Sequence, residues 1–210
     1  MTLILSKPPV GSRGRTGKGG SAMGEIVAEQ TLDSDTVFEG KLVTVKRLKV
    51  RLPDGGSTER EIVEHPEVVA VIPRLDDGRI VMVRQYRKAA ERVLLEVPAG
   101  GIDAGETAAE AVRREMLEET GYKVGSIRHL TSFYTSPGFT TELMHLYEAT
   151  DLEAGEATEE TDRIEVVLLT PDEATAQLAG TVPDAKTLLA LAYAQEPGST
   201  ASDRQSRLEI

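Results

Sequence analysis

Residues 100–122 read GGIDAGETAAEAVRREMLEETGY, and the spacing of their apolar and charged residues predicts one amphipathic helix. We expect the helix to run from Thr107 to Thr120. Thr107 and Glu110 have the spacing of a capping box, and Gly121 suits the left-handed residue that follows a helix. The apolar residues that fall on one stripe are Ala108, Ala111, Val112 and Met116. This stripe is predicted to pack on a core.

The other face of this helix is acidic. Because an α-helix advances about 100° per residue, Glu115, Glu118 and Glu119 share an arc of roughly 100°. Like charges at these spacings repel each other, and a divalent cation is the simplest partner that would favour the cluster. Hard carboxylate oxygens select Mg²⁺, or Mn²⁺, over softer metals. An ordinary solvated acidic face is the alternative interpretation.

Strand patterns dominate the sequence before this helix. Val and Leu alternate with polar residues from Leu42 to Leu52, turn-forming residues follow at 53–56, and a second alternating segment runs from Thr58 to His65. These segments predict an N-terminal β-hairpin. The alternation slips by one residue at Lys46-Arg47, so we expect a β-bulge there that keeps the apolar side chains on one face.

The next two apolar segments, Val68 to Arg74 and Arg79 to Gln85, flank a turn at 76–78 and should form a pair deeper in the sheet. The remaining segments with strand patterns are 94–97, 127–134, 143–149 and 164–169, and those with helical patterns are 171–178 and 184–195. The expected fold is α/β, of the α+β type, with a mixed β-sheet sandwiched between helices.

Domain boundaries follow from composition. Residues 1–28 include a Gly-, Pro-, Ser- and Lys/Arg-rich stretch, so we expect a disordered leader, with Met23 as an alternative start to Met1. Residues 29–66 hold the N-terminal strands and residues 67–195 the main domain. The polar segment 196–210 is expected to be a disordered tail.

Bulk charge and residue usage exclude several classes of function. A net charge of −11 argues against a nucleic-acid partner, since phosphate backbones are bound by Lys and Arg. The chain has no Cys, which rules out a disulfide framework and a thiolate nucleophile and fits a reducing cytoplasm. No apolar segment is long enough for a membrane span. We therefore predict a soluble, cytoplasmic protein.

The pattern Gly100, Glu106, Arg114-Glu115, Glu118-Glu119 and Gly121 resembles the Nudix box of the Nudix hydrolase family. One departure is Tyr122, where the family usually has an aliphatic residue; this position is expected to affect packing and not chemistry. The resemblance implies the Nudix fold and metal-dependent hydrolysis of an organic diphosphate.

The resemblance also implies a role for each residue of the box. Glu115 and Glu119 would be the main metal ligands, Glu118 a further ligand, and the carbonyl of Ala99 a backbone ligand. Arg114 and Glu106 would orient the cluster. Gly100 would let the loop approach the metals without a Cβ.

Residues outside the box resemble the ADP-ribose pyrophosphatase group. The segments that carry this likeness are 60–66, 85–87, 95–100 and Ser136-Pro137-Gly138. The implied reaction is Mg²⁺-dependent hydrolysis of ADP-ribose, or a close ADP-sugar, to AMP and ribose 5-phosphate. A pyrophosphatase for another nucleoside diphosphate sugar, such as GDP-mannose, and a non-catalytic nucleotide sensor are the alternatives.

Four residues are candidates for substrate contacts. Arg60 and Arg87 would bind the diphosphate or the terminal ribose, because Arg binds phosphate oxygens bidentately and the chain otherwise repels anions. Phe38 could stack on adenine, and Gly138 belongs to the loop that resembles the group. The alternatives are surface positions for both Arg residues and a core position for Phe38.

The general base is expected in one of two loops. Glu142, shortly after Ser136-Pro137-Gly138, resembles the base of several enzymes of the group. The rival is a later acidic run that comprises Glu156, Glu159, Glu160, Asp162 and Glu165.

The N-terminal hairpin also predicts a homodimer. The alternation from Leu42 to His65 leaves one apolar face of the hairpin, and we expect that a single small domain does not cover it. Because the enzymes it resembles exchange this region between subunits, Arg60 would reach the neighbouring active site. The alternative is a hairpin that packs on its own domain.

Overall fold

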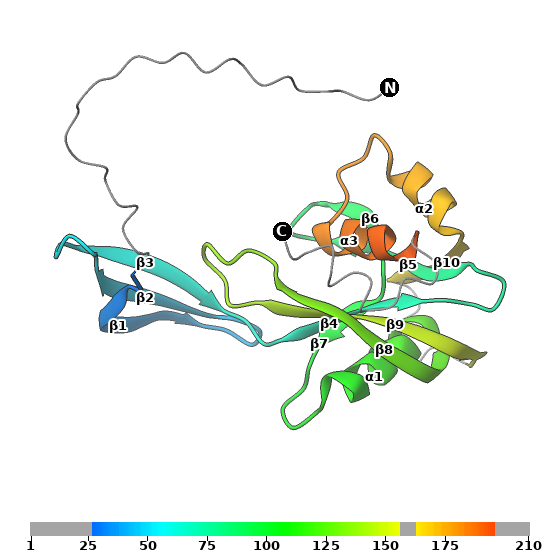
Figure 1. The fold of residues 1–210 in the computed structure, drawn as a ribbon, viewed down its shortest axis with the longest axis horizontal. Coiled ribbons are helices and arrows are strands. Elements are labelled where there is room, and N and C mark those ends of the chain that lie inside the picture. Colours follow the sequence, from blue (N-terminus) through cyan, green and yellow to red (C-terminus); the bar gives the residue numbers. More distant parts are fainter. Residues whose placement is uncertain (1–26, 156–162, 196–210) are drawn as a thin grey trace, which may run out of the picture.

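The computed structural model describes residues 27–155 and 163–195 of the chain (Figure 1). It begins with a sheet of three antiparallel strands in the order β1-β2-β3. These strands are β1 (Gln30–Glu39), β2 (Thr44–Arg51) and β3 (Ser57–Glu64). The predicted hairpin is confirmed as β2 and β3, whereas β1 was not predicted. Nearly all of the leader and the whole of the tail expected at 196–210 lie outside the described residues.

The β-bulge predicted at Lys46-Arg47 is wrong for the hairpin. β2 pairs with β3 in unbroken register from Thr44 opposite Glu64 to Arg51 opposite Ser57. The register shifts lie instead between β1 and β2. Val45 faces Val63 across the hairpin, while Leu48 and Val50 project to the opposite face, so both faces carry apolar side chains and no bulge is needed.

A mixed sheet of four strands forms the centre of the molecule. Its strands in spatial order are β7 (Ala99–Gly101), β4 (Val68–Pro73), β9 (Leu143–Ala154) and β8 (Tyr122–Tyr134). β4 and β9 are parallel and the other pairs are antiparallel. A third sheet lies beside it in the order β10-β5-β6. Its strands are β10 (Ile164–Leu169), β5 (Ile80–Arg87) and β6 (Arg92–Glu96).

The predicted pairing of the two apolar segments within one sheet is wrong, although their burial is confirmed. β4 and the first half of β5 are fully buried and share one core cluster, but they belong to different sheets, and among the described residues the only bridge near them is an isolated one between Arg74 and Ile80. A strand that is apolar on both faces needs a neighbour on each side and a layer above and below it. β4 therefore has neighbours β7 and β9, and β5 has neighbours β10 and β6.

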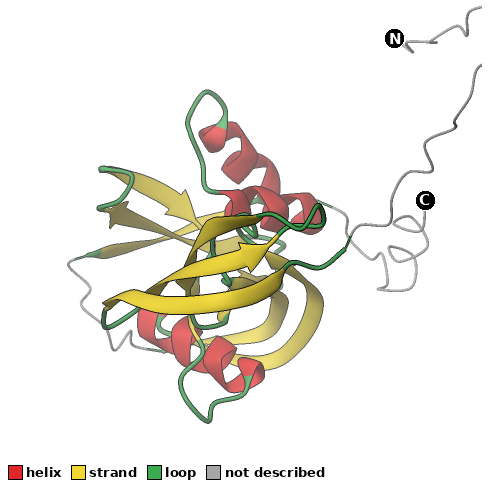
Figure 2. Cartoon of the chain, turned by 90° about the vertical axis from the view of Figure 1, so that its left-hand side faces the viewer, coloured by secondary structure: helices red, strands yellow, loops and turns green. Residues whose placement is uncertain are grey.

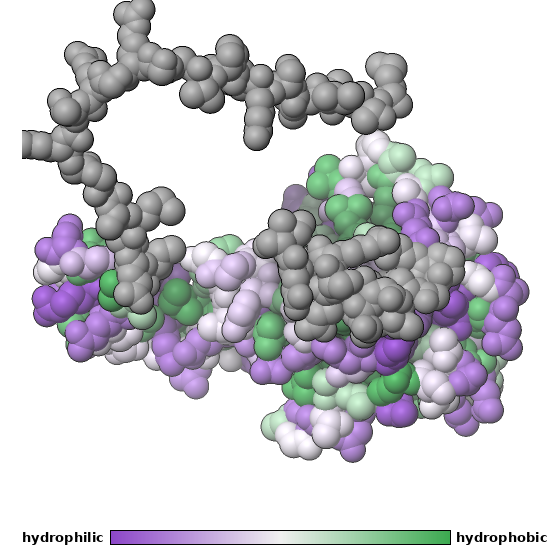
Figure 3. Space-filling view, viewed as in Figure 1, coloured by the Kyte–Doolittle hydropathy of each residue, from purple (hydrophilic) through white to green (hydrophobic). Residues whose placement is uncertain are grey.

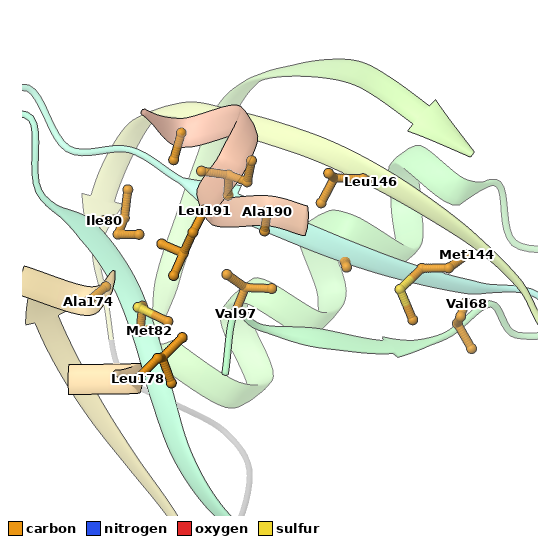
Figure 4. Packing of buried hydrophobic residues seen from close by; sticks show 13 residues of the cluster. Val68, Ile80, Met82, Val97, Met144, Leu146, Ala174, Leu178, Ala190 and Leu191 are labelled. Atoms are coloured by element: carbon orange, nitrogen blue, oxygen red, sulfur yellow. The ribbon is translucent and has the colours of Figure 1, made fainter. Parts of the chain in front are cut away.

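Helices cover both faces of the central sheet (Figure 2), as the sequence predicts. α1 (Ala108–Thr120) packs on one face through Ala111, Val112 and Met116. α2 (Pro171–Leu178) and α3 (Ala185–Ala194) lie on the other side, where Leu178 and Leu191 join the larger core cluster (Figure 4). Among the described residues, no helix has the length and hydropathy of a membrane span.

The predicted start and end of the acidic helix α1 are confirmed. Thr107 and Glu110 form the capping box at the start of α1, with both reciprocal bonds present. Gly121 ends the helix at φ 75°, in the left-handed region. The acidic helix is therefore fixed at both ends, and its orientation on β4 is set by the apolar stripe.

Candidate active site

The contact between β7 and α1 creates the centre of the site. Gly100 pairs with Val69 in the central sheet, and the carboxylate of Glu115 lies directly over the Gly100 backbone. A Cβ placed on Gly100 would lie 2.0 Å from the carboxyl carbon of Glu115, far inside van der Waals contact. The structure therefore requires glycine here because of the close approach of the helix carboxylate.

Arg114 connects the carboxylates to one another. Its Nε and Nη2 donate to the two oxygens of Glu106 at 3.0 and 2.9 Å, and its Nη1 donates to Glu115 at 2.7 Å and Glu118 at 3.0 Å. Nη2 also donates to the carbonyl of Gly101 at 2.7 Å. The hydrogen bonds from Arg114 are the main cause that lowers the pKa of Glu106. Arg114 thus ties the glycine loop, the capping region and the acidic face into one unit.

Glu119 has a different environment, because its side chain is buried, with 8% of the residue exposed. Burial, helped by the nearby charge of Glu115, raises the pKa of Glu119 to about 7. The backbone N–H of Ala99 donates to Glu119 at 3.2 Å and opposes the shift. A buried carboxylate beside a second carboxylate is the electrostatic situation that a cation relieves.

The residues present fit a hard divalent cation in the type of donor atom they offer. Glu115, Glu118 and Glu119 offer only oxygen donors, and Ala99 lies beside Glu119 at the same edge of the sheet. In the arrangement described, Glu115 and Glu118 point at Arg114, and within residues 27–155 and 163–195 no three acidic or histidine side chains already enclose a cation site. A metal would therefore require these two carboxylates to rotate away from Arg114.

A second charged cluster borders the box. Arg87 on β5 donates from Nε and Nη2 to the carboxylate of Glu96, with the shortest bond at 2.7 Å, and Lys186 on α3 donates to the same carboxylate at 2.5 Å. Glu96 is 1% exposed. Burial alone would raise the pKa of Glu96, but the bonds from Arg87 and the charge of Lys186 bring it below its usual value. Both cations also act electrostatically on Glu119, which places the cluster beside the box.

This cluster limits the role of Arg87, which the sequence assigns to the diphosphate or the terminal ribose of the substrate. Two of its nitrogens are already bound to Glu96. Glu96 and Lys186 were not predicted as site residues. A charged residue between Leu95 and Val97 in an apolar strand was the available signal for Glu96, whereas Lys186 lies 90 residues away and no local pattern marks it.

The other candidate substrate residues lie away from the box in this chain. Arg60 on β3 pairs with Glu29 at 2.6 Å, and Phe38 on β1 is 57% exposed with its ring against Gly40. The expectation of a core position for Phe38 does not hold. Gly138 lies in the loop between β8 and β9, and a Cβ added there would meet no atom within 4 Å. Neither sterics nor backbone strain demands glycine at 138.

The structure describes one of the two candidate locations of the general base, the loop with Glu142, and only the end of the other, the later acidic run. Glu142 is half-buried just before β9, and its carboxylate accepts a hydrogen bond from Thr135 Oγ1 at 2.5 Å. Of the later acidic run, Glu165 on β10 pairs with Arg84 at 3.1 Å. The other members lie outside the described residues, and they are Glu156, Glu159, Glu160 and Asp162.

β7, the loop after it and α1 are joined by two features: the contact of Gly100 with Glu115, and the bonds from Arg114 to Glu115 and Glu118. This is the strand–loop–helix unit of the Nudix fold, and it defines the class of the protein as a Nudix-type hydrolase. Comparison with known families agrees with this class. The NUDIX domain matches residues 64–191, and the nucleoside diphosphate sugar hydrolase N-terminal domain matches residues 29–63. The chain belongs to the Nudix hydrolase family.

Two relatives resemble the chain over nearly their whole length. An ADP-ribose pyrophosphatase of Bacillus subtilis (strain 168) is 40% identical over 171 residues, which are 80% of this chain and 92% of the relative. A methanol dehydrogenase activator of Bacillus methanolicus is also 40% identical, over 82% of this chain and 96% of the relative. The crystal structure of an ADP compounds hydrolase has a TM-score of 0.73 and covers 89% of this chain and 99% of its own, but at 22% identity it shows the fold alone.

Proposed function

We propose that this enzyme hydrolyses the diphosphate linkage of ADP-ribose, or of a close ADP-sugar, to AMP and ribose 5-phosphate with the help of Mg²⁺. The observation that carries the proposal is the complete box, in which Glu119 is buried beside Glu115 over a glycine that only this contact explains. The match of residues 29–63 to a nucleoside diphosphate sugar hydrolase domain and the 40% identity to an ADP-ribose pyrophosphatase support this substrate class.

The residues of the box divide the work. Glu115, Glu118 and Glu119 would hold the metal, while Arg114 keeps Glu106 and the Gly101 carbonyl in place after the other two carboxylates turn away. When bound, Mg²⁺, or Mn²⁺, neutralises the negative charge of the diphosphate and lowers the pKa of a water molecule. Arg87, already oriented by Glu96, lies on the same side as Glu119 and has a third nitrogen for the substrate.

For the general base we propose Glu142, with the later acidic run as the rival. Thr135 orients the Glu142 carboxylate, and the backbone N–H of Glu142 donates to Thr140 Oγ1 at 3.2 Å. A base must be fixed within hydrogen-bond reach of the proton it removes. The later acidic run is a candidate because of its position in the sequence. Its last member, Glu165, is already paired with Arg84.

We further propose a homodimer in which the N-terminal sheet contributes Arg60 to the partner's pocket. All ten residues of β1 are exposed, including Leu32, Val37 and Phe38. Figure 3 shows apolar surface interleaved with polar surface over this sheet. β1 is also an edge strand, which proteins usually cover or pair. The cytoplasmic location expected from the sequence stays a prediction.

The test is incubation of the protein with ADP-ribose or GDP-mannose in the presence of Mg²⁺, followed by chromatography of the products. We expect AMP and ribose 5-phosphate from ADP-ribose, and slower release of GMP from GDP-mannose. Faster turnover of GDP-mannose would transfer the assignment to the other nucleoside diphosphate sugars. Tight binding of ADP-ribose without any product would indicate a nucleotide sensor.

A further inference from the structure

The loop at 135–142, between β8 and β9, touches the N-terminal sheet at the end of β3 (Figure 1). The backbone N–H of Val63 donates to the Phe139 carbonyl at 2.7 Å, and the N–H of Thr141 donates to the Val63 carbonyl at 3.0 Å. These bonds form a short parallel bridge between units that lie far apart in the sequence. We call the set Val63, His65, Phe139 and Thr141 the latch.

The side chain of Thr141 strengthens the latch in both directions. Its Oγ1 accepts a hydrogen bond from the N–H of His65 at 3.0 Å and lies 3.3 Å from the His65 carbonyl, to which it donates. A hydroxyl group can do both at once, whereas a valine side chain of the same shape can do neither. The backbone bonds of the latch do not depend on the residue type, so the contribution of Thr141 can be tested separately.

The base of the same loop is closed where it leaves β8 and enters β9. The N–H of Thr135, its first residue, donates to the carbonyl of Glu142, its last, at 3.2 Å, and Thr135 Oγ1 donates to the Glu142 carboxylate. Directly after the latch, the carbonyl of Glu67 accepts the N–H of Ile102, two residues beyond Gly100. The chain segment 65–67 thus connects the N-terminal sheet to the box, and the loop connects the same sheet to β8 and β9.

A groove of about 470 Å³ lies between these connections. It is lined by both units, with Ile62, His65 and Glu67 on one side and Tyr134, Phe139 and Thr141 on the other. The groove exists only while β3 and the loop keep their relative positions. Any substrate contact made by the N-terminal sheet depends on the same positions.

We infer that Thr141 is a positioning residue that locks the N-terminal sheet against the catalytic domain, so that substrate-binding side chains on the sheet are held in place. This inference rests on the proposed function for its kinetic consequence, because Arg60 on β3 is a proposed substrate contact in the partner's pocket, and the latch sets the orientation in which the sheet extends from its own domain. The box carboxylates lie outside the latch, and the proposed base Glu142 is held by its own bonds to Thr135 and Thr140 and not by Thr141. Loss of Thr141 should therefore weaken substrate binding and leave the chemical step largely intact.

The experiment compares the full-length variants Thr141→Val and Thr141→Ser with the wild type and with a matched control, Thr150→Val. Thr150 lies on β9, and within the described residues its hydroxyl makes no hydrogen bond. For Thr141→Val we expect the KM for ADP-ribose to rise about tenfold with kcat changed by less than about twofold, as the loss of one or two hydrogen bonds implies. Thr141→Ser should restore the KM, and Thr150→Val should leave it unchanged.

Hydrogen exchange of the latch amides provides a readout that needs no substrate. In Thr141→Val, the His65 and Val63 amides should exchange at least about tenfold faster, while amides of β4 keep their protection. Wild-type exchange and KM in Thr141→Val would overturn the inference, as would failure of Thr141→Ser to restore them. A wild-type enzyme that does not cleave ADP-ribose would refute the proposed function, and the exchange measurement would still decide the latch.

Discussion

The carboxylate of Glu115 occupies the space where a side chain at Gly100 would begin, because a Cβ at Gly100 would lie 2.0 Å from the Glu115 carboxyl carbon. This relationship links β7, which carries the first residue of the box, to the acidic helix that follows it. Gly100 is held by its pairing with Val69, and Glu115 by the packing of α1. Neither element can move away without disturbing the core between β4 and α1.

Gly100→Ala should therefore displace Glu115 and reduce turnover by roughly a hundredfold, a loss typical of a misplaced metal ligand or its support. The matched control is Gly101→Ala, since a Cβ at Gly101 would meet no atom within 4 Å. We expect near wild-type activity from the control. Equal activities of the two variants, measured as AMP release, would show that the close approach at Gly100 is not needed.

Glu96→Gln should destabilise the fold by about 3 kcal/mol, because it leaves Arg87 without its buried counter-charge and Lys186 with Asp184 alone. The pKa of Glu96 is lowered in the folded state, so its contribution is present above the unfolded-state pKa and is lost as pH falls through the folded value. Denaturant unfolding from pH 7 down to pH 3 should show a smaller acid-induced loss in the variant. Glu165→Gln, which removes an exposed pair with Arg84, is the control and should change stability by less than about 0.5 kcal/mol.

Glu142→Gln should slow the chemical step while Mg²⁺ and substrate still bind, because a general base acts on a proton and is not a ligand. Single-turnover kinetics, with substrate binding measured separately, separate the two effects. If Glu142→Gln keeps its activity and a substitution of Glu159 or Glu160 abolishes it, the base lies in the later acidic run.

The composite pocket predicts complementation between two inactive variants. Arg60→Ala removes the contribution of the N-terminal sheet and Glu119→Gln that of the box, so mixed dimers should regain one intact pocket out of two. Light scattering should first give the mass of a dimer. A monomeric mass, or no recovery of activity after verified subunit exchange, would refute the shared site; each variant mixed with itself is the control.

The sequence predicts α1 well because its signals are local. The capping box, the apolar stripe and Gly121 each depend on residues within a few positions of one another. β1 could not be found in the same way: every residue of Gln30–Glu39 is exposed, so no face of the strand needs to be apolar. The division of β4 and β5 between two sheets depends on which strands become their neighbours, and an apolar run does not contain that information.

In the candidate site, too, the local features could be predicted from the sequence and the contacts between distant segments could not. Gly100, Arg114 and the helix carboxylates lie within one continuous segment, and the structure brings them together as their spacing suggests. The pairing of Glu96 with Lys186 and the latch between Val63 and Thr141 join distant segments, so they appear only in the folded chain. These supporting contacts around the site therefore depend on how the strands and helices are arranged in the fold, which no local sequence pattern gives.

The central claim is that the acidic face of α1 binds the metal used in catalysis, and Glu119→Gln tests it most directly. The substitution keeps the shape of the side chain and removes a buried charge, so the metal-free variant should be at least as stable as the wild type at pH 8. The measurement is the turnover of ADP-ribose at saturating Mg²⁺ by a variant shown to be folded. The account predicts a loss of more than about a hundredfold, whereas wild-type turnover would contradict the assignment of Glu119 as a metal ligand.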